Sequence, residues 1–95
     1  MPKRATKRST APALVSKSVI AKEIARIIDD RGWTQTEASF AIHEAPSQIS
    51  LMVTGKLRGF SLERLLRTLT ALGRDVEIRV MKAKRNPGKV RLNVK

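Results

Sequence analysis

Apolar residues follow a helical period through most of the chain and a strand period near its end. Over residues 18–31 they recur on one helical face, at Ile20, Ile24, Ile27 and Ile28. Gly32 follows this stretch directly, where a left-handed residue would close the last helical turn. The pattern therefore predicts a first helix over 18–31.

Two short helices joined by a tight turn are predicted next, over 35–42 and 46–54. Thr34 and Glu37 have the spacing of a capping box, which would start the first of the two. Pro46 suits the first position of the second helix, where its missing N–H is no loss. The short turn between the helices requires them to lie close together.

A fourth helix is predicted over 62–72, after a basic loop. Ser61 would cap it, and Phe60 and Leu65 could pack together across the cap as a hydrophobic staple. Its buried face would be a stripe of leucines, namely Leu62, Leu65, Leu66, Leu69 and Leu72. Gly73 would end the helix.

Beyond this helix the apolar period becomes two. The first alternating run places its apolar residues at Val76, Ile78 and Val80. A second run follows Asn86-Pro87-Gly88, with apolar residues at Val90, Leu92 and Val94. Two such runs around a Pro-Gly turn predict a β-hairpin. Because a lone hairpin is marginal in water, we expect it to pack on the helices or to pair with a second copy of the chain.

The charge of the chain indicates a polyanionic partner. Its 95 residues include 20 Lys and Arg against 8 Asp and Glu, a formal net charge of +12. Such a charge repels itself unless DNA, RNA or an anionic surface offsets it. The first dozen residues carry four of these cations and are expected to form a disordered arm. This arm would be either a solvated tail or a contact to DNA phosphates or the minor groove.

Several classes of function are disfavoured. His43 is the single histidine and cysteine is absent, so neither a nucleophile–base pair nor a metal site is evident. We therefore expect no enzyme, no metal and no cofactor. No apolar run approaches the roughly 20 residues that a membrane span requires. No signal-type apolar run follows the basic N-terminus, so we expect a cytoplasmic protein, close to the nucleoid, without a membrane partner.

Residues 35–54 have the pattern of a helix-turn-helix. This motif needs small residues in its first helix, here Ala38 and Ser39, so that the second helix can cross closely. It also needs inner apolar residues, here Ile42, Ile49 and Met52. The second helix would then fit the roughly 12 Å width of a DNA major groove. Its outer side would carry Ser47, Gln48, Ser50 and Leu51.

The chain resembles the Xre/Cro-like helix-turn-helix family over about residues 17–82. The resemblance begins at Arg31-Gly32-Trp33-Thr34-Gln35, continues through Glu37-Ala38-Ser39, and ends at Ile49-Ser50 and Gly55. More specifically, the stretches GFSLERLL at 59–66 and ALGRDVEI at 71–78 resemble the branch that contains HigA-like antitoxins of toxin–antitoxin modules. The resemblance implies a dimeric transcription regulator of double-stranded DNA, and an autorepressing antitoxin with a toxin protein as a further partner.

The resemblance also implies roles for particular residues. Base edges would be read from the recognition helix by Pro46, Ser47, Ser50 and Leu51. Gln48 joins this group because a glutamine amide can pair with adenine. DNA phosphates would be contacted by Gln35, Thr54, Lys56 and Arg58. In such relatives a C-terminal strand often contributes to dimerisation, in agreement with the hairpin prediction.

Three features depart from the family pattern. His43 stands where the family usually has glycine, although His tolerates a left-handed backbone better than most residues. Glu44 replaces an apolar residue and would repel phosphate near the groove. The recognition helix lacks Lys and Arg, so Gln48 alone offers pairing with adenine, beside methyl contacts from Leu51 and Thr54. We therefore expect affinity to depend mainly on phosphate contacts, with modest direct base specificity.

These observations predict a mainly α protein of four to five helices, an Xre/Cro-like helix-turn-helix domain with a C-terminal β-strand or β-hairpin at a dimer interface. The expected parts are a basic N-terminal arm, a DNA-binding domain and a basic dimerisation segment, at 1–16, 17–74 and 75–95. Pairing of the C-terminal strands within one chain, between two chains, or both, stays open.

Two alternative functions stay open beside sequence-specific regulation. The chain could be a protein-interaction module that neutralises a toxin and binds DNA weakly or non-specifically. It could instead be an RNA-binding protein that uses the basic tail and hairpin. Single-stranded RNA sites use stacking aromatics. The three aromatic residues of this chain, Trp33, Phe40 and Phe60, are interpreted as core or near-core residues.

Overall fold

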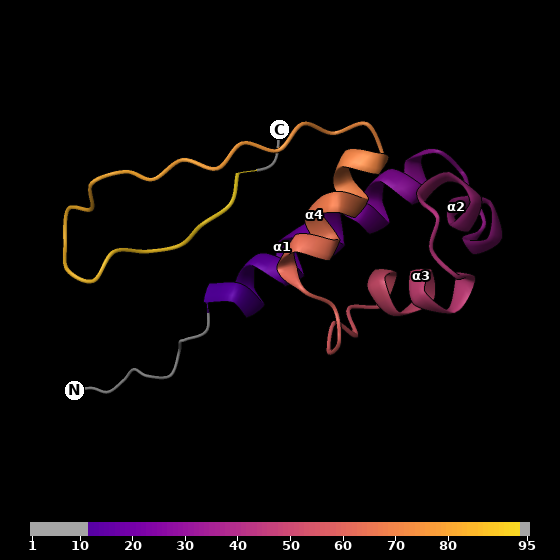
Figure 1. Cartoon of the computed structure of the whole chain (residues 1–95), viewed down its shortest axis with the longest axis horizontal. Coiled ribbons are helices and arrows are strands. Elements are labelled where there is room, and N and C mark those ends of the chain that lie inside the picture. The colour runs from indigo at the N-terminus through magenta and orange to yellow at the C-terminus, as the bar shows by residue number, and fades with distance from the viewer. Residues whose placement is uncertain (1–11, 94–95) are drawn as a thin grey trace.

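A computed structural model describes residues 12–93, with side chains described from residue 17. In this range the elements are α1 (Pro12–Asp30), α2 (Gln35–Ile42), α3 (Pro46–Val53) and α4 (Leu62–Ala71). Figure 1 shows α2 and α3 together at one end of the long helix α1, with α4 beside α1. Helix α1 contacts both α3 and α4, and α2 contacts α3 and α4, so the four helices enclose one core.

Helix α1 is longer than the apolar period predicted. We expected it to begin at residue 18 and assigned residues 12–16 to the N-terminal arm, whereas the helix begins at Pro12. A proline suits the first position of a helix and disfavours helical backbone in the residue before it, so it is a natural starting point. The rest of the predicted basic arm, residues 1–11, lies outside the described residues.

Three of the helices end in the same arrangement around a left-handed glycine. After each, the glycine amide donates to the carbonyl three residues earlier, and the next amide donates to the carbonyl five residues earlier. This is the Schellman motif, which satisfies carbonyls that the helix leaves unpaired. The glycines are Gly32, Gly55 and Gly73, with φ values of 66°, 79° and 86°. The helix ends predicted at these glycines are therefore confirmed.

The predicted starts of α2, α3 and α4 are confirmed as well. Thr34 Oγ1 accepts from the Glu37 amide at 3.1 Å, and Glu37 Oε1 accepts from the Thr34 amide at 2.8 Å, which completes the capping box. Ser61 Oγ accepts from the Arg64 amide at 3.0 Å and caps α4. Pro46 occupies the first turn of α3.

The core joins the apolar faces that the sequence analysis identified. Its buried members are Ile20, Ile24, Ile27, Ile28, Ala38, Ile42, Ile49, Met52, Phe60, Leu65, Leu69 and Leu72. Leu62 and Leu66 of the predicted leucine stripe, together with Trp33, are only partly buried against this core. Leu57, which we placed in a basic loop without a packing role, is also buried. One continuous core therefore supports both short helices.

The interpretation of Phe40 as a core or near-core residue is wrong. Its side chain is 77% exposed on α2. The buried residues of α2 are Ala38 and Ile42. At about 100° of rotation for each residue, position 40 lies about 200° from both of them around the helix axis, and therefore faces away from the core.

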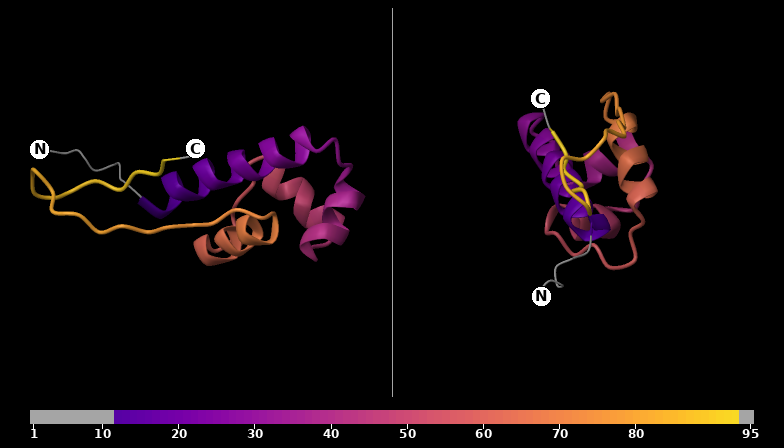
Figure 2. Two further views of the ribbon diagram at one scale, coloured as in Figure 1. Left: turned by 90° about the horizontal axis from the view of Figure 1, so that it is seen from above. Right: turned by 90° about the vertical axis from the view of Figure 1, so that its left-hand side faces the viewer.

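The predicted C-terminal strand is not found in the single chain. Residues 73–93 contain no strand, and Figure 2 shows them leaving the helices as two extended arms joined by a bend. Their apolar side chains stand in solvent: Ile78 is 77% exposed and Val80 is 96% exposed. A hairpin with nothing packed on its apolar face gains too little burial to offset its ordering entropy, which accounts for the difference.

Candidate nucleic-acid interface

Helices α2 and α3 form the two arms of a helix-turn-helix. Ala38, on the inner side of α2, has no exposed surface, which lets α3 approach closely. His43 closes α2 in a left-handed conformation, with φ 58° and ψ 41°. The expectation that His43 adopts the backbone of the usual turn glycine is therefore confirmed. The chain then reverses and α3 begins at Pro46.

The five residues predicted to read bases differ in how far they are exposed. Pro46 and Ser47, in the first turn of α3, are exposed. Gln48, Ser50 and Leu51 are half-buried, and Leu51 packs partly against the core. The free surface of α3 is therefore concentrated at its first turn, and Leu51 has a structural role beside any contact with DNA.

The four residues predicted to contact phosphates lie on two segments. Gln35 is the first residue of α2, and it is exposed. Thr54, Lys56 and Arg58 follow α3 and are also exposed. The Thr54 hydroxyl donates to the Ser50 carbonyl at 2.7 Å, so it remains able to accept a hydrogen bond but its proton is already used. Lys56 and Arg58 are therefore the two members of this set that carry a positive charge.

Glu44 does not present a free negative charge, contrary to our expectation. Its carboxylate accepts two hydrogen bonds from the Arg64 guanidinium of α4, from Nη2 at 2.6 Å and from Nε at 3.1 Å. Only 19% of the Glu44 side chain and 29% of the Arg64 side chain are exposed. Because the pair carries no net charge and is held in place, the repulsion of phosphate predicted from Glu44 alone is offset.

Arg64 is the residue of this surface that the sequence analysis missed. Its guanidinium lies 4.5 Å from the centre of the Phe60 ring, and its Nη2 also donates to Gln48 Oε1 at 3.2 Å. It therefore ties α4 to the turn and to α3 at once. Its hydrogen-bond partners, Glu44 and Gln48, lie 20 and 16 residues away along the chain, so no local signal marks these contacts.

The hydrogen bonds from Arg64 lower the pKa of Glu44 below its usual value of 4.5, although burial opposes the shift. The hydrogen bond from Arg26 likewise lowers the pKa of Glu23, a buried carboxylate on α1 that Arg74 also approaches. Because the pKa is lower in the folded chain, the unfolded chain takes up protons at a higher pH than the folded chain does. Both carboxylates therefore stabilise the fold fully above pH 4.5, and this contribution is lost as the pH falls through the lowered pKa values.

We expect the free energy of unfolding to decrease as the pH falls below about 5, and to decrease less in Glu44→Gln than in the wild type. Urea titrations at several pH values would measure this. Glu63→Gln is the matched control, because Glu63 makes only an exposed ion pair with Arg67 on α4. An acid profile changed equally by both substitutions would contradict the role assigned to the Glu44–Arg64 pair.

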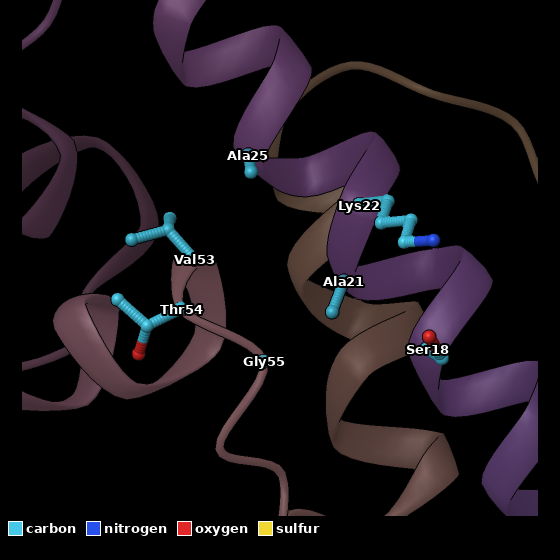
Figure 3. A pocket seen from close by; sticks show the side chains of 7 residues that line it. All are labelled: Ser18, Ala21, Lys22, Ala25, Val53, Thr54 and Gly55. Atoms are coloured by element: carbon cyan, nitrogen blue, oxygen red, sulfur yellow. The ribbon is translucent and has the colours of Figure 1, made fainter.

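A shallow groove of about 240 Å³ runs between α1 and the end of α3 (Figure 3). Its lining consists of Ser18, Ala21, Lys22, Ala25, Val53, Thr54 and Gly55. The polar groups among these are two hydroxyls and one amine, with no carboxylate or imidazole to act as a general base.

Within residues 12–93, no group of three or more His, Asp or Glu side chains is placed to hold a metal ion. None of the helices in the same range combines the length and the apolar character that a membrane span requires.

A buried crossing of two short helices, with the first turn of the second exposed and cations just beyond it, is the geometry of a helix-turn-helix DNA-binding domain. The sequence pattern of the family described as "Helix-turn-helix domain" matches residues 6–81. The chain belongs to this family.

A solved protein whose name assigns it to the XRE family of transcriptional regulators has a similar structure, with a TM-score of 0.77 and 31% sequence identity. The similarity covers 87% of this chain and 93% of that protein. None of the curated proteins matches the sequence. The Xre-like part of the resemblance stated above is therefore confirmed, whereas the more specific likeness to HigA-like antitoxins stays a prediction.

Proposed function

We propose that this protein is a dimeric transcription regulator that binds a specific double-stranded DNA site with α3 in the major groove. The observation that carries this proposal is the exposed first turn of α3, held on a rigid core by the left-handed turn at His43. Base edges are read by Pro46, Ser47, Gln48, Ser50 and Leu51, and phosphates are bound by Gln35, Thr54, Lys56 and Arg58. Because α3 carries no cation, phosphate contacts supply most of the affinity.

A second copy of the chain is the partner that we assign to the C-terminal segment, residues 75–95. Its exposed apolar side chains alternate along two arms, and a Cβ built on Gly88 would lie only 2.9 Å from the Ala83 Cβ, so the arms approach each other at the bend. Pairing with another copy would bury these side chains and satisfy the backbone. A dimer would present two recognition helices to half-sites about one helical turn apart.

Replacing Ile78 and Val80 together by glutamate is expected to convert a dimer to a monomer and to weaken DNA binding by at least about tenfold, because one half-site is then lost. Sedimentation equilibrium and a DNA titration would measure the two effects. The matched control is a double glutamate substitution at Lys82 and Lys84, whose side chains contribute no apolar surface to the proposed dimer interface. A wild-type monomer, or a dimer unchanged by the Ile78 and Val80 substitutions, would overturn this assignment.

We further propose that the regulator is the autorepressing antitoxin of a toxin–antitoxin module. The likeness of 59–66 and 71–78 to HigA-like antitoxins supports this. In that case the promoter of its own operon contains the DNA site, and a toxin protein binds the same chain. Co-purification with the product of a neighbouring gene would test the second partner.

A protein-interaction module that neutralises a toxin, with weak or non-specific DNA binding, is the second candidate. The exposed apolar side chains of residues 76–92 favour it, because an apolar surface of a toxin could cover them as well as a second copy could. The absence of Lys and Arg from α3 also favours it.

Fluorescence anisotropy with DNA from upstream of the gene and with a scrambled sequence, each at two salt concentrations, separates the two candidates. A preference for the upstream DNA that survives the higher salt supports specific autoregulation. Equal binding to both, with a steep decrease at higher salt, is the behaviour of non-specific phosphate contacts. That result would contradict the regulator and favour the interaction module.

A further inference from the structure

Arg64 is held more firmly than any other cation of the candidate interface. Two of its nitrogens, Nε and Nη2, donate to the two Glu44 oxygens, at 3.1 and 2.6 Å, and its guanidinium carbon lies over the Phe60 ring, 4.5 Å from the ring centre. A paired fork of this kind fixes both the position and the orientation of the guanidinium. Arg64 is therefore a fixed group against which a neighbouring side chain can be oriented.

Gln48, in the first turn of α3, is that neighbouring side chain. Its Oε1 lies 3.2 Å from Arg64 Nη2 and accepts a hydrogen bond from it. A guanidinium can only donate, so the Gln48 atom that faces it must be the carbonyl oxygen and not the amide nitrogen. The contact therefore fixes which way the Gln48 amide points. Its Nε2, with two N–H donors, is left as the group that Gln48 can offer to a ligand.

This orientation changes which base Gln48 can read. Pairing with adenine requires the glutamine oxygen to accept from the adenine N6 amino group while the nitrogen donates to N7. In this protein that oxygen already accepts a hydrogen bond from Arg64, so the adenine amino group would have to share it with a charged donor. Guanine, by contrast, presents two acceptors in the major groove, N7 and O6, and needs donors only. The two N–H groups of Nε2 match that edge.

We propose that Arg64 is a positioning residue that orients Gln48, so that α3 selects guanine rather than adenine at one base pair of each half-site. The inference rests on the proposed function, in which α3 enters the major groove. It replaces our expectation from the sequence that Gln48 pairs with adenine. It also explains why Glu44 stands in the turn: its carboxylate holds the guanidinium that holds Gln48.

The experiment is a binding selection from a double-stranded DNA library with about 20 random base pairs, followed by sequencing of the bound fraction. The full-length wild type is expected to enrich guanine over adenine by about tenfold at one position of each half-site. Gln48→Ala should abolish the enrichment at that position alone. Arg64→Met should free the Gln48 oxygen and shift the same position toward adenine. Arg67→Met is the matched control on α4 and should leave the guanine enrichment in place.

Circular dichroism of each variant checks that it is folded. Should Arg64→Met unfold, Glu44→Gln serves in its place, because it keeps Arg64 but weakens the ion pair that holds it and should reduce the preference for guanine.

A library in which no sequence is enriched would overturn the proposed function together with this inference. An enriched sequence that Gln48→Ala leaves unchanged would overturn the inference alone. Loss of guanine in Gln48→Ala, with guanine retained in a folded Arg64→Met, would overturn the positioning role of Arg64.

Discussion

Replacing Ile24 by alanine is expected to lower the free energy of unfolding by about 2–5 kcal/mol, the range for a large aliphatic side chain removed from a packed core. Ile24 is 0% exposed and belongs to α1, which contacts both α3 and α4. Its loss would leave a cavity between these helices that they cannot fill without moving. For a domain of this size, which is only marginally stable, the predicted decrease is a large part of the total. Urea unfolding followed by circular dichroism would measure it.

Phe40→Ala is the matched control, because it removes an even larger apolar side chain from an exposed position. A surface substitution of this kind changes stability by no more than about 0.5 kcal/mol. If Phe40→Ala were as destabilising as Ile24→Ala, the side chain would have to be buried in solution, and the placement of Phe40 on the outside of α2 would be wrong.

Reversing the charge of Lys56 and Arg58 together, to glutamate, is expected to weaken DNA binding by about 100-fold and to reduce the slope of log affinity against log salt by about 2. Both side chains are exposed in the segment that follows α3. Each is expected to neutralise one phosphate, and its replacement by glutamate adds a repulsion as well. The change should affect specific and scrambled DNA alike, because phosphates carry no sequence information. Anisotropy titrations at four or five salt concentrations would give both quantities.

The comparison variant for this experiment carries the same charge change at Lys82 and Arg85. These residues lie on the C-terminal arms, which Figure 1 shows well away from α2 and α3. We expect a much smaller loss of affinity there. Equal losses in the two double variants would mean that total charge and not a defined face governs binding, and the docking surface around α3 would have to be abandoned.

Signals carried by a few consecutive residues were sufficient to predict most of the helix boundaries. The capping box at Thr34, the Ser61 cap, and the glycines after α1, α3 and α4 each act through hydrogen bonds to residues at most five positions away. The apolar faces of α1 and α4 were predictable for a similar reason, because the helical period alone places such residues on one side. The left-handed conformation of His43 was indicated by the family resemblance, in which glycine usually stands at this position of the turn.

The candidate site was predictable only in outline. The sequence indicated which helix would enter a groove and which cations would follow it. It did not indicate that Arg64 pairs with Glu44 and orients Gln48, because these contacts join residues 16 and 20 positions apart. Their distance is set by how α4 packs across α2 and α3. Glu44, which was expected to repel phosphate, is therefore one half of an ion pair with Arg64.

The sequence by itself determined the order of the helices, most of their limits, and the two short helices of the motif, because caps, periods and turns depend on nearby residues. The tertiary structure decided what each side chain meets. It placed Phe40 outside, brought Leu57 inside, and left residues 73–93 without a strand in the single chain. These outcomes depend on burial and pairing between distant segments, and a strand also needs a neighbour to bond with. The local pattern of apolar and polar residues does not show whether such a neighbouring strand is present.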